Sequence, residues 1–189
     1  FEGVWSRFKP VLGKDKRGVT GVDKNKIIEI GKKISTLPSG FNIHKTLEKI
    51  FESKKKMFTE NAPIDWSTAE TLAFGTLLIE GFSVRLSGQD SGRGTFSQRH
   101  SVLRDQDSHK RHIPLNHISK DQKNFEVIDT LLSELAVLGF EFGYTLSEPD
   151  TLVLWEAQFG DFANGAQIII DQFITSGESK WGRASGLVM

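Results

Sequence analysis

The stretch TLVLWEAQFGDFANGAQ, residues 151–167, decides the fold class that we predict for this chain. Its first five residues, Thr151 to Trp155, form a continuous apolar run of the length of one strand. A strand that is apolar on both faces is typical of a parallel sheet covered by helices. Polar Glu156 and Gln158 follow at once, so the stretch predicts a buried strand that ends in a polar loop.

Helical and strand patterns alternate through the rest of residues 61–189. Strands are predicted at 82–87 and 125–128, and another begins at 186–189. Helices are predicted from a capping box at Ser67 and Glu70, from an N-cap at Ser133, and over 166–174. Residues 99–116 are polar and irregular. This alternation predicts an α/β domain with a mainly parallel sheet flanked by helices.

The first 60 residues have a different rhythm and a different charge. Apolar spacing predicts helices over 23–34 and 42–58, so we expect a helical N-terminal extension, residues 1–60, before the domain at 61–189. This extension carries 14 Lys and Arg against 7 Asp and Glu, whereas the remainder carries 10 against 17. A nucleic-acid surface is one interpretation. A solvated face that packs on an acidic neighbour is favoured, because aromatic residues are not interleaved with the lysines.

Composition excludes several classes of site. The chain has no cysteine, which excludes disulfides, thiolate metal sites and a cysteine nucleophile. No apolar run approaches the roughly 18 residues that span a bilayer, and no secretory signal opens the sequence. The apolar end ASGLVM, residues 184–189, predicts a strand that is interrupted, so we expect the domain to be truncated at its C-terminus.

The sequence RLSGQDSGRGTFSQRH, residues 85–100, contains the first candidate functional residues. It lacks the ending of a P-loop and the spacing of a dinucleotide fingerprint. Its glycines allow tight turns and a close approach to a ligand or a second chain, and a purely structural loop explains the pattern equally well. His100, at its edge, is a candidate proton donor or positive charge beside an anionic substrate. The other nearby histidines are interpreted as surface residues.

Other candidates follow the second and third predicted strands, where ligands bind in such sheets. Glu134 opens an apolar helix whose N-terminus stabilises a carboxylate, although an ordinary first-turn acidic residue fits as well. Phe159 and Phe162 are aromatic residues that can stack on a flat heterocycle or close the core. Periodicity alone favours the core.

Three long motifs resemble one enzyme family. They are VRLSGQDSGRGTFSQRH (84–100), DTLLSELAVLGFEFGY (129–144) and LVLWEAQFGDFANGAQIIIDQFITSGESKWGR (152–183). Together they resemble the thiamine-diphosphate-dependent first component of the 2-oxoglutarate dehydrogenase complex, from about Trp66 to Met189. The resemblance implies the pyrimidine-binding domain of a homodimer that decarboxylates 2-oxoglutarate. It also implies succinyl transfer to the lipoyl domain of the dihydrolipoyl succinyltransferase component in the tricarboxylic acid cycle, in bacterial cytoplasm or mitochondrial matrix.

The same resemblance implies roles for individual residues. Glu134 matches the glutamate that hydrogen-bonds the first ring nitrogen of the cofactor's aminopyrimidine and favours its imino tautomer. Phe162 matches the aromatic residue that packs on the pyrimidine, with Phe159 and Gln158 as neighbouring alternatives. Asp90 lies in the loop that lines the cofactor cleft, and His100 is expected to help hold substrate.

The family's motif for magnesium and diphosphate is not found in this sequence, so no metal ligand is assigned here. The remaining alternatives are a dehydrogenase component for 2-oxoadipate or another 2-oxo acid, and a non-catalytic module that keeps the fold. A membrane or nucleic-acid partner is not expected.

Overall fold

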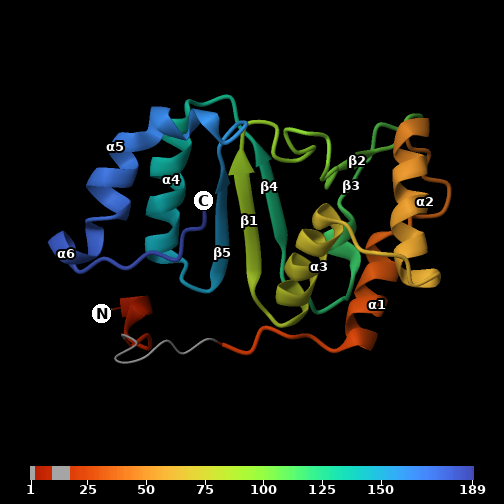
Figure 1. The fold of residues 1–189 in the computed structure, drawn as a ribbon, viewed down its shortest axis with the longest axis horizontal. Helices are drawn as coiled ribbons and strands as arrows, with labels where there is room; N and C mark the ends of the chain where they lie inside the picture. Colours follow the sequence, from red (N-terminus) through yellow and green to blue (C-terminus); the bar gives the residue numbers. More distant parts are fainter. Residues whose placement is uncertain (1–2, 10–17) are drawn as a thin grey trace. The chain divides into compact units, whose positions relative to one another are not determined.

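The computed structural model of the chain describes residues 3–9 and 18–189. Three strands, β1 (Ser83–Gly88), β4 (Phe125–Asp129) and β5 (Thr151–Glu156), form a parallel sheet in the order β4-β1-β5 (Figure 1). Helices flank this sheet, so the predicted α/β class and the three predicted strand positions are confirmed. The chain divides into two compact units, which are described separately. They are named here the α3 unit (residues 22–84 and 91–127) and the α4 unit (1–21, 85–90 and 128–189).

Three helices build most of the α3 unit. They are α1 (Lys24–Ile34), α2 (Lys45–Thr59) and α3 (Trp66–Ile79), and the first two confirm the helices predicted within residues 1–60. α1 begins where the Asp23 side chain accepts hydrogen bonds from two backbone N–H groups. Its Gly31 lies so close to α2 that an added Cβ would be 2.2 Å from the ring of Phe58. Glycine at this position therefore permits close packing of the two helices.

The capping box predicted for α3 is wrong. The N-cap is Asp65, whose carboxylate accepts a hydrogen bond from the N–H of Thr68 at 2.7 Å. Ser67 donates instead to the carbonyl of Gln98, and Glu70 pairs with Arg99. Both side chains are therefore engaged by the segment that follows β1, and they do not cap their own helix.

Residues 99–116 are more regular than predicted. β2 (Leu103–Arg104) pairs antiparallel with β3 (Arg111–His112), and a 3-10 helix, η2, covers Pro114–His117. The turn between the strands is held by Asp105, which accepts hydrogen bonds from the backbone N–H groups of Asp107 and Ser108. A side chain that organises the turn leaves no hydrophobic period in the sequence, which explains why the pattern missed this hairpin.

The α4 unit is built around one long helix and β5. The helix α4 (Glu134–Ser147) is capped by Ser133, whose hydroxyl accepts a hydrogen bond from the backbone N–H of Ala136, so the predicted N-cap is confirmed. One buried cluster in the core of this unit consists of Val137, Leu138, Trp155 and Ala166. Near the N-terminus of the chain, a short 3-10 helix, η1 (Gly3–Trp5), places the Trp5 indole N–H 2.7 Å from the carbonyl oxygen of Leu146.

The segment after β5 is helical, as predicted, but it changes type along its length. It contains η3 (Asp161–Ala166, 3-10), α5 (Gln167–Ile169), the π-helical η4 (Ile170–Ile174) and α6 (Gly177–Trp181). The strand expected at residues 186–189 amounts to one parallel bridge between Leu154 and Val188. Within the part of the chain that the structure describes, no helix has the length and apolar content needed to cross a membrane.

Candidate functional site

Glu134 is a buried carboxylate held by two donors. It is the first residue of α4 and is 7% exposed. One carboxylate oxygen, Oε2, accepts a hydrogen bond from the indole Nε1 of Trp155 at 3.1 Å. The other, Oε1, accepts one from the backbone N–H of Gln158 at 3.0 Å. These two contacts fix the orientation of the carboxylate.

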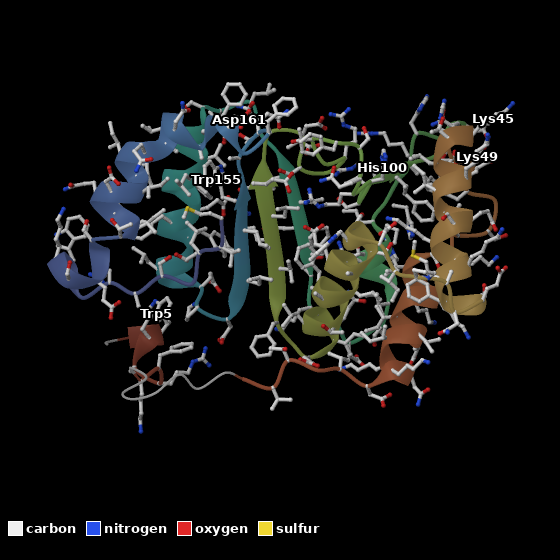
Figure 2. The ribbon with its side chains drawn as sticks, viewed as in Figure 1. Trp5, Lys45, Lys49, His100, Trp155 and Asp161 are labelled. Carbon is white, nitrogen blue, oxygen red and sulfur yellow. The ribbon has the colours of Figure 1, made fainter. Side chains whose placement is uncertain are left out.

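The local sequence explains this geometry. Ser133 ends the loop after β4 and starts α4, so the next side chain stands at the positive end of the helix. Trp155 is 3% exposed and belongs to the core between β5 and α4, where Figure 2 shows it. Its indole N–H needs an acceptor when buried. The Glu134 carboxylate satisfies that need, and each of its oxygens keeps capacity for a further hydrogen bond.

Two phenylalanines lie just beyond the end of β5. Phe159 and Phe162 are 53% and 54% exposed, and their ring centroids are 6.4 Å apart. The backbone reverses through two residues in the left-handed region, Phe159 (φ 56°) and Gly160 (φ 76°). A non-glycine residue with positive φ is uncommon, and such strain is often found at ligand sites. The two rings therefore form an exposed aromatic surface, whereas a role in closing the core would bury them.

A pocket of about 450 Å³ lies in the same unit. It is lined by Gln89, Asp90, Asp129, Thr130, Leu131 and Gln158. The loops meet there because the N–H of Thr130 donates to the carbonyl of Gly88 and the Gln89 side chain donates to the carbonyl of Leu132. The structure thus brings the predicted residues Asp90 and Gln158 to one pocket, at the carboxyl ends of strands, where ligands bind in parallel sheets.

His100 belongs to the α3 unit and lines a different cavity. Figure 2 shows it in the segment that follows β1. Its neighbour Arg99 is 5% exposed and pairs with Glu70 at 2.8 and 3.0 Å, while its Nη1 donates to the carbonyl of Ser91 at 2.8 Å. Arg99 therefore has a structural role in the glycine-rich loop. The catalytic role predicted for His100 stays a prediction.

Sequence reasoning missed two residues of interest. Trp155 was interpreted only as an apolar strand residue, although a tryptophan at a buried position signals a nearby hydrogen-bond acceptor. Lys54 was interpreted as a charge at the end of a helix, yet it lies on the buried stripe of α2 with Phe51 and Phe58. Its spacing from these phenylalanines, three and four residues, was the available signal.

No group of three or more His, Asp or Glu side chains that could hold a metal ion is found within residues 3–9 and 18–189.

Comparison of the chain with known proteins identifies its family. Residues 62–189 match the family model described as "Transketolase, pyrimidine binding domain". The chain is 54% identical over 189 residues to the 2-oxoglutarate dehydrogenase E1 component of Brucella anthropi, and 53% identical to those of Brucella canis and Brucella suis. In each case the match covers 99% of this chain and 19% of the relative, so the chain spans about a fifth of the length of these relatives. The chain belongs to the transketolase pyrimidine-binding domain family.

Proposed function

We propose that this chain is the pyrimidine-binding part of a thiamine-diphosphate-dependent 2-oxoglutarate dehydrogenase component. The observation that carries the proposal is the buried Glu134 carboxylate, held by Trp155 and by the backbone of Gln158. The names of the relatives support the choice of 2-oxoglutarate as the substrate. A component for 2-oxoadipate is the alternative within the same chemistry.

The residues fit the aminopyrimidine end of thiamine diphosphate. Glu134 offers a fixed acceptor with lone pairs left for one more donor, as a protonated ring nitrogen requires. Phe159 and Phe162 offer exposed flat faces for a heterocycle, and the pocket beside Gln158 contains Asp90 as a further polar group. When bound, thiamine diphosphate supplies the electron sink for decarboxylation of a 2-oxo acid.

The chain's own residues have distinct tasks in this proposal. Glu134 orients the pyrimidine ring by a hydrogen bond to a ring nitrogen, since Trp155 already fixes the carboxylate. The carboxylate and the ring nitrogen share the proton of that hydrogen bond. The aromatic residues exclude water from the ring face, and this strengthens the hydrogen bond to the carboxylate. The role of His100 would be to hold the anionic substrate.

The wider assembly is part of the same proposal. The relatives are much longer than this chain, which leaves room for magnesium and diphosphate ligands elsewhere in the protein. The proposal also includes a homodimer, transfer of succinyl to the lipoyl domain of a succinyltransferase component, and a place in the tricarboxylic acid cycle. The proposed compartment is the bacterial cytoplasm or the mitochondrial matrix.

Glu134→Gln in the complete protein tests the proposal. The measurement is 2-oxoglutarate-dependent reduction of an artificial electron acceptor with thiamine diphosphate and magnesium, with pyruvate and 2-oxoadipate as competing substrates. Loss of at least about 100-fold in kcat is expected, the lower range of general acid–base effects. Glu148→Gln is the matched control, since it makes the same change at the exposed C-cap of the same helix.

The outcomes separate the alternatives. Activity that disappears in Glu134→Gln and persists in Glu148→Gln supports both the reaction and the residue. Wild-type activity that prefers 2-oxoadipate changes the substrate. A folded, cofactor-supplied wild type without activity favours the non-catalytic module.

A further inference from the structure

The loop that leads into Glu134 is held mainly by hydrogen bonds. It consists of residues 130–133, between β4 and α4, and ends directly before Glu134. Its two leucines, Leu131 and Leu132, have exposed side chains, so they contribute little packing within the described part of the chain. The position of the Glu134 backbone at the start of α4 therefore depends on the polar contacts of this loop.

Thr130 fixes the first half of the loop. Its backbone N–H donates to the carbonyl of Gly88 at 2.9 Å and so ties the loop to the end of β1. Its hydroxyl oxygen, Oγ1, accepts a hydrogen bond from the N–H of Leu132 at 3.2 Å. The carbonyl of Leu132, which points the chain toward Ser133 and α4, is held by neither of these contacts.

Gln89, the residue that follows β1, supplies the donor for that carbonyl. Its side-chain Nε2 lies 3.1 Å from the carbonyl oxygen of Leu132, two residues before Glu134. A carbonyl oxygen only accepts hydrogen bonds, so the amide nitrogen of Gln89 is the donor. Among the described residues, Gln89 is the only one outside the loop whose side chain hydrogen-bonds it.

Glu134 is thereby held from two sides. The backbone N–H of Gln158, after β5, donates to the carboxylate itself. Gln89, after β1, holds the loop from which the side chain of Glu134 begins. Gln89 and Gln158 line the same pocket of about 450 Å³. Loss of the contact made by Gln89 would leave the carboxylate attached at its tip while its backbone gains freedom.

We propose that Gln89 is a positioning residue, which orients the Glu134 carboxylate by fixing the loop that precedes α4. This inference rests on the proposed function, because Glu134 is the residue that Gln89 positions. A small misplacement of an orienting group slows the reaction strongly even when the substrate still binds. Gln89 is therefore expected to affect kcat and the binding of thiamine diphosphate, and to leave the KM for 2-oxoglutarate unchanged.

Gln89→Met in the complete protein tests this role, since methionine has a similar length and cannot donate. We expect kcat to fall about 10-fold at unchanged KM for 2-oxoglutarate. Affinity for thiamine diphosphate, measured by calorimetric titration, should fall about 5-fold. Gln106→Met is the matched control, because Gln106 also donates from its side chain to a backbone carbonyl, that of Arg104, in an exposed turn of the α3 unit. This control should match the wild type in both measurements.

A double-mutant cycle shows whether Gln89 acts through Glu134. In the Glu134→Gln background the carboxylate is absent, so adding Gln89→Met should change the affinity for thiamine diphosphate less than about twofold. Hydrogen exchange without cofactor gives a second readout. The backbone N–H groups of Leu132 and Ala136 should exchange faster in Gln89→Met than in Gln106→Met.

The outcomes separate this inference from the proposed function. A fully active Glu134→Gln refutes the proposed function. An impaired Glu134→Gln beside a Gln89→Met that matches Gln106→Met overturns only the role of Gln89. Equal losses from Gln89→Met in both backgrounds also overturn it, because Gln89 would then act on the ligand directly.

Discussion

The buried ion pair of the α4 unit offers a sharp test of how this fold is stabilised. Arg85 of β1 and Glu141 of α4 form a bidentate pair, with Nε–Oε2 at 2.8 Å and Nη2–Oε1 at 2.9 Å. Their side chains are 11% and 2% exposed. The guanidinium also lies over the rings of Tyr144 and Phe140, with its Cζ 4.7 and 5.5 Å from their centroids. Arg85→Met would remove the positive charge and leave a buried carboxylate alone.

The expected magnitudes distinguish a broken pair from a removed pair. Breaking a buried pair by removing one partner costs about 3–5 kcal/mol, because the other charge is left uncompensated. Removing both partners with apolar residues is often neutral or even stabilising. Arg85 also makes two cation–π interactions, and the absence of each adds about 0.5–1 kcal/mol to the cost. We therefore expect Arg85→Met to lose about 4–7 kcal/mol, and Arg85→Met with Glu141→Leu to lose at most about half of that.

Urea unfolding measures these differences as shifts in midpoint at constant slope. Arg7→Met is the control, because Arg7 pairs with Asp150 at an exposed position and its loss should change the midpoint little. The reasoning is refuted if the double variant is as unstable as Arg85→Met. It is also refuted if Arg85→Met unfolds at the same midpoint as Arg7→Met.

Two further predictions concern single hydrogen-bonded groups. Trp155→Phe keeps an aromatic ring but removes the donor to the Glu134 carboxylate, so we expect affinity for thiamine diphosphate in the complete protein to fall by about 10-fold. Calorimetric titration measures this affinity, and circular dichroism checks the folding of the variant. Unchanged affinity would contradict the positioning role of Trp155. Hydrogen bonds from the backbone N–H groups of Ser108 and Asn42 lower the pKa of Asp105 from 3.8 to about 2. The ionised side chain therefore stabilises the fold fully above pH 3.8, and this contribution is lost as the pH falls through about 2. Acid unfolding of Asp105→Asn should lack this component, so the stabilities of variant and wild type should differ at pH 5 and approach each other near pH 2.

Periodicity predicted the central elements of the fold well because their side chains pack locally in a repeating way. The run at 151–156 and the stripe of α4 each show one period over a whole element, and the structure confirms both. The start of α3 was wrong because Asp65 and Ser67 both stand where an N-cap fits. The choice between them depends on Gln98 and Arg99, about 30 residues further along the chain. A local pattern contains no information about those partners.

The candidate site shows the same limit. Glu134 was found through its motif, and the hydrogen-bond capacity of Trp155 was visible in the sequence, but their pairing depends on how β5 and α4 pack. Phe159 and Phe162 were expected on periodicity to close the core, yet both are exposed. The left-handed turn at Phe159 and Gly160 explains this difference, since it carries the chain away from the core after β5.

The buried charged side chains explain why ion pairs must be observed in the structure and cannot be predicted from the sequence. Arg85 meets Glu141, and Arg99 meets Glu70, across separations of 56 and 29 residues. Each pair satisfies the rule that buried charges are compensated, although neither is visible in the sequence. Lys54 is buried to a similar degree; burial lowers its pKa, and the carboxylates of Asp65 and Glu70 oppose this effect. The compensation of a buried charge therefore depends on partners that only the folded chain brings together.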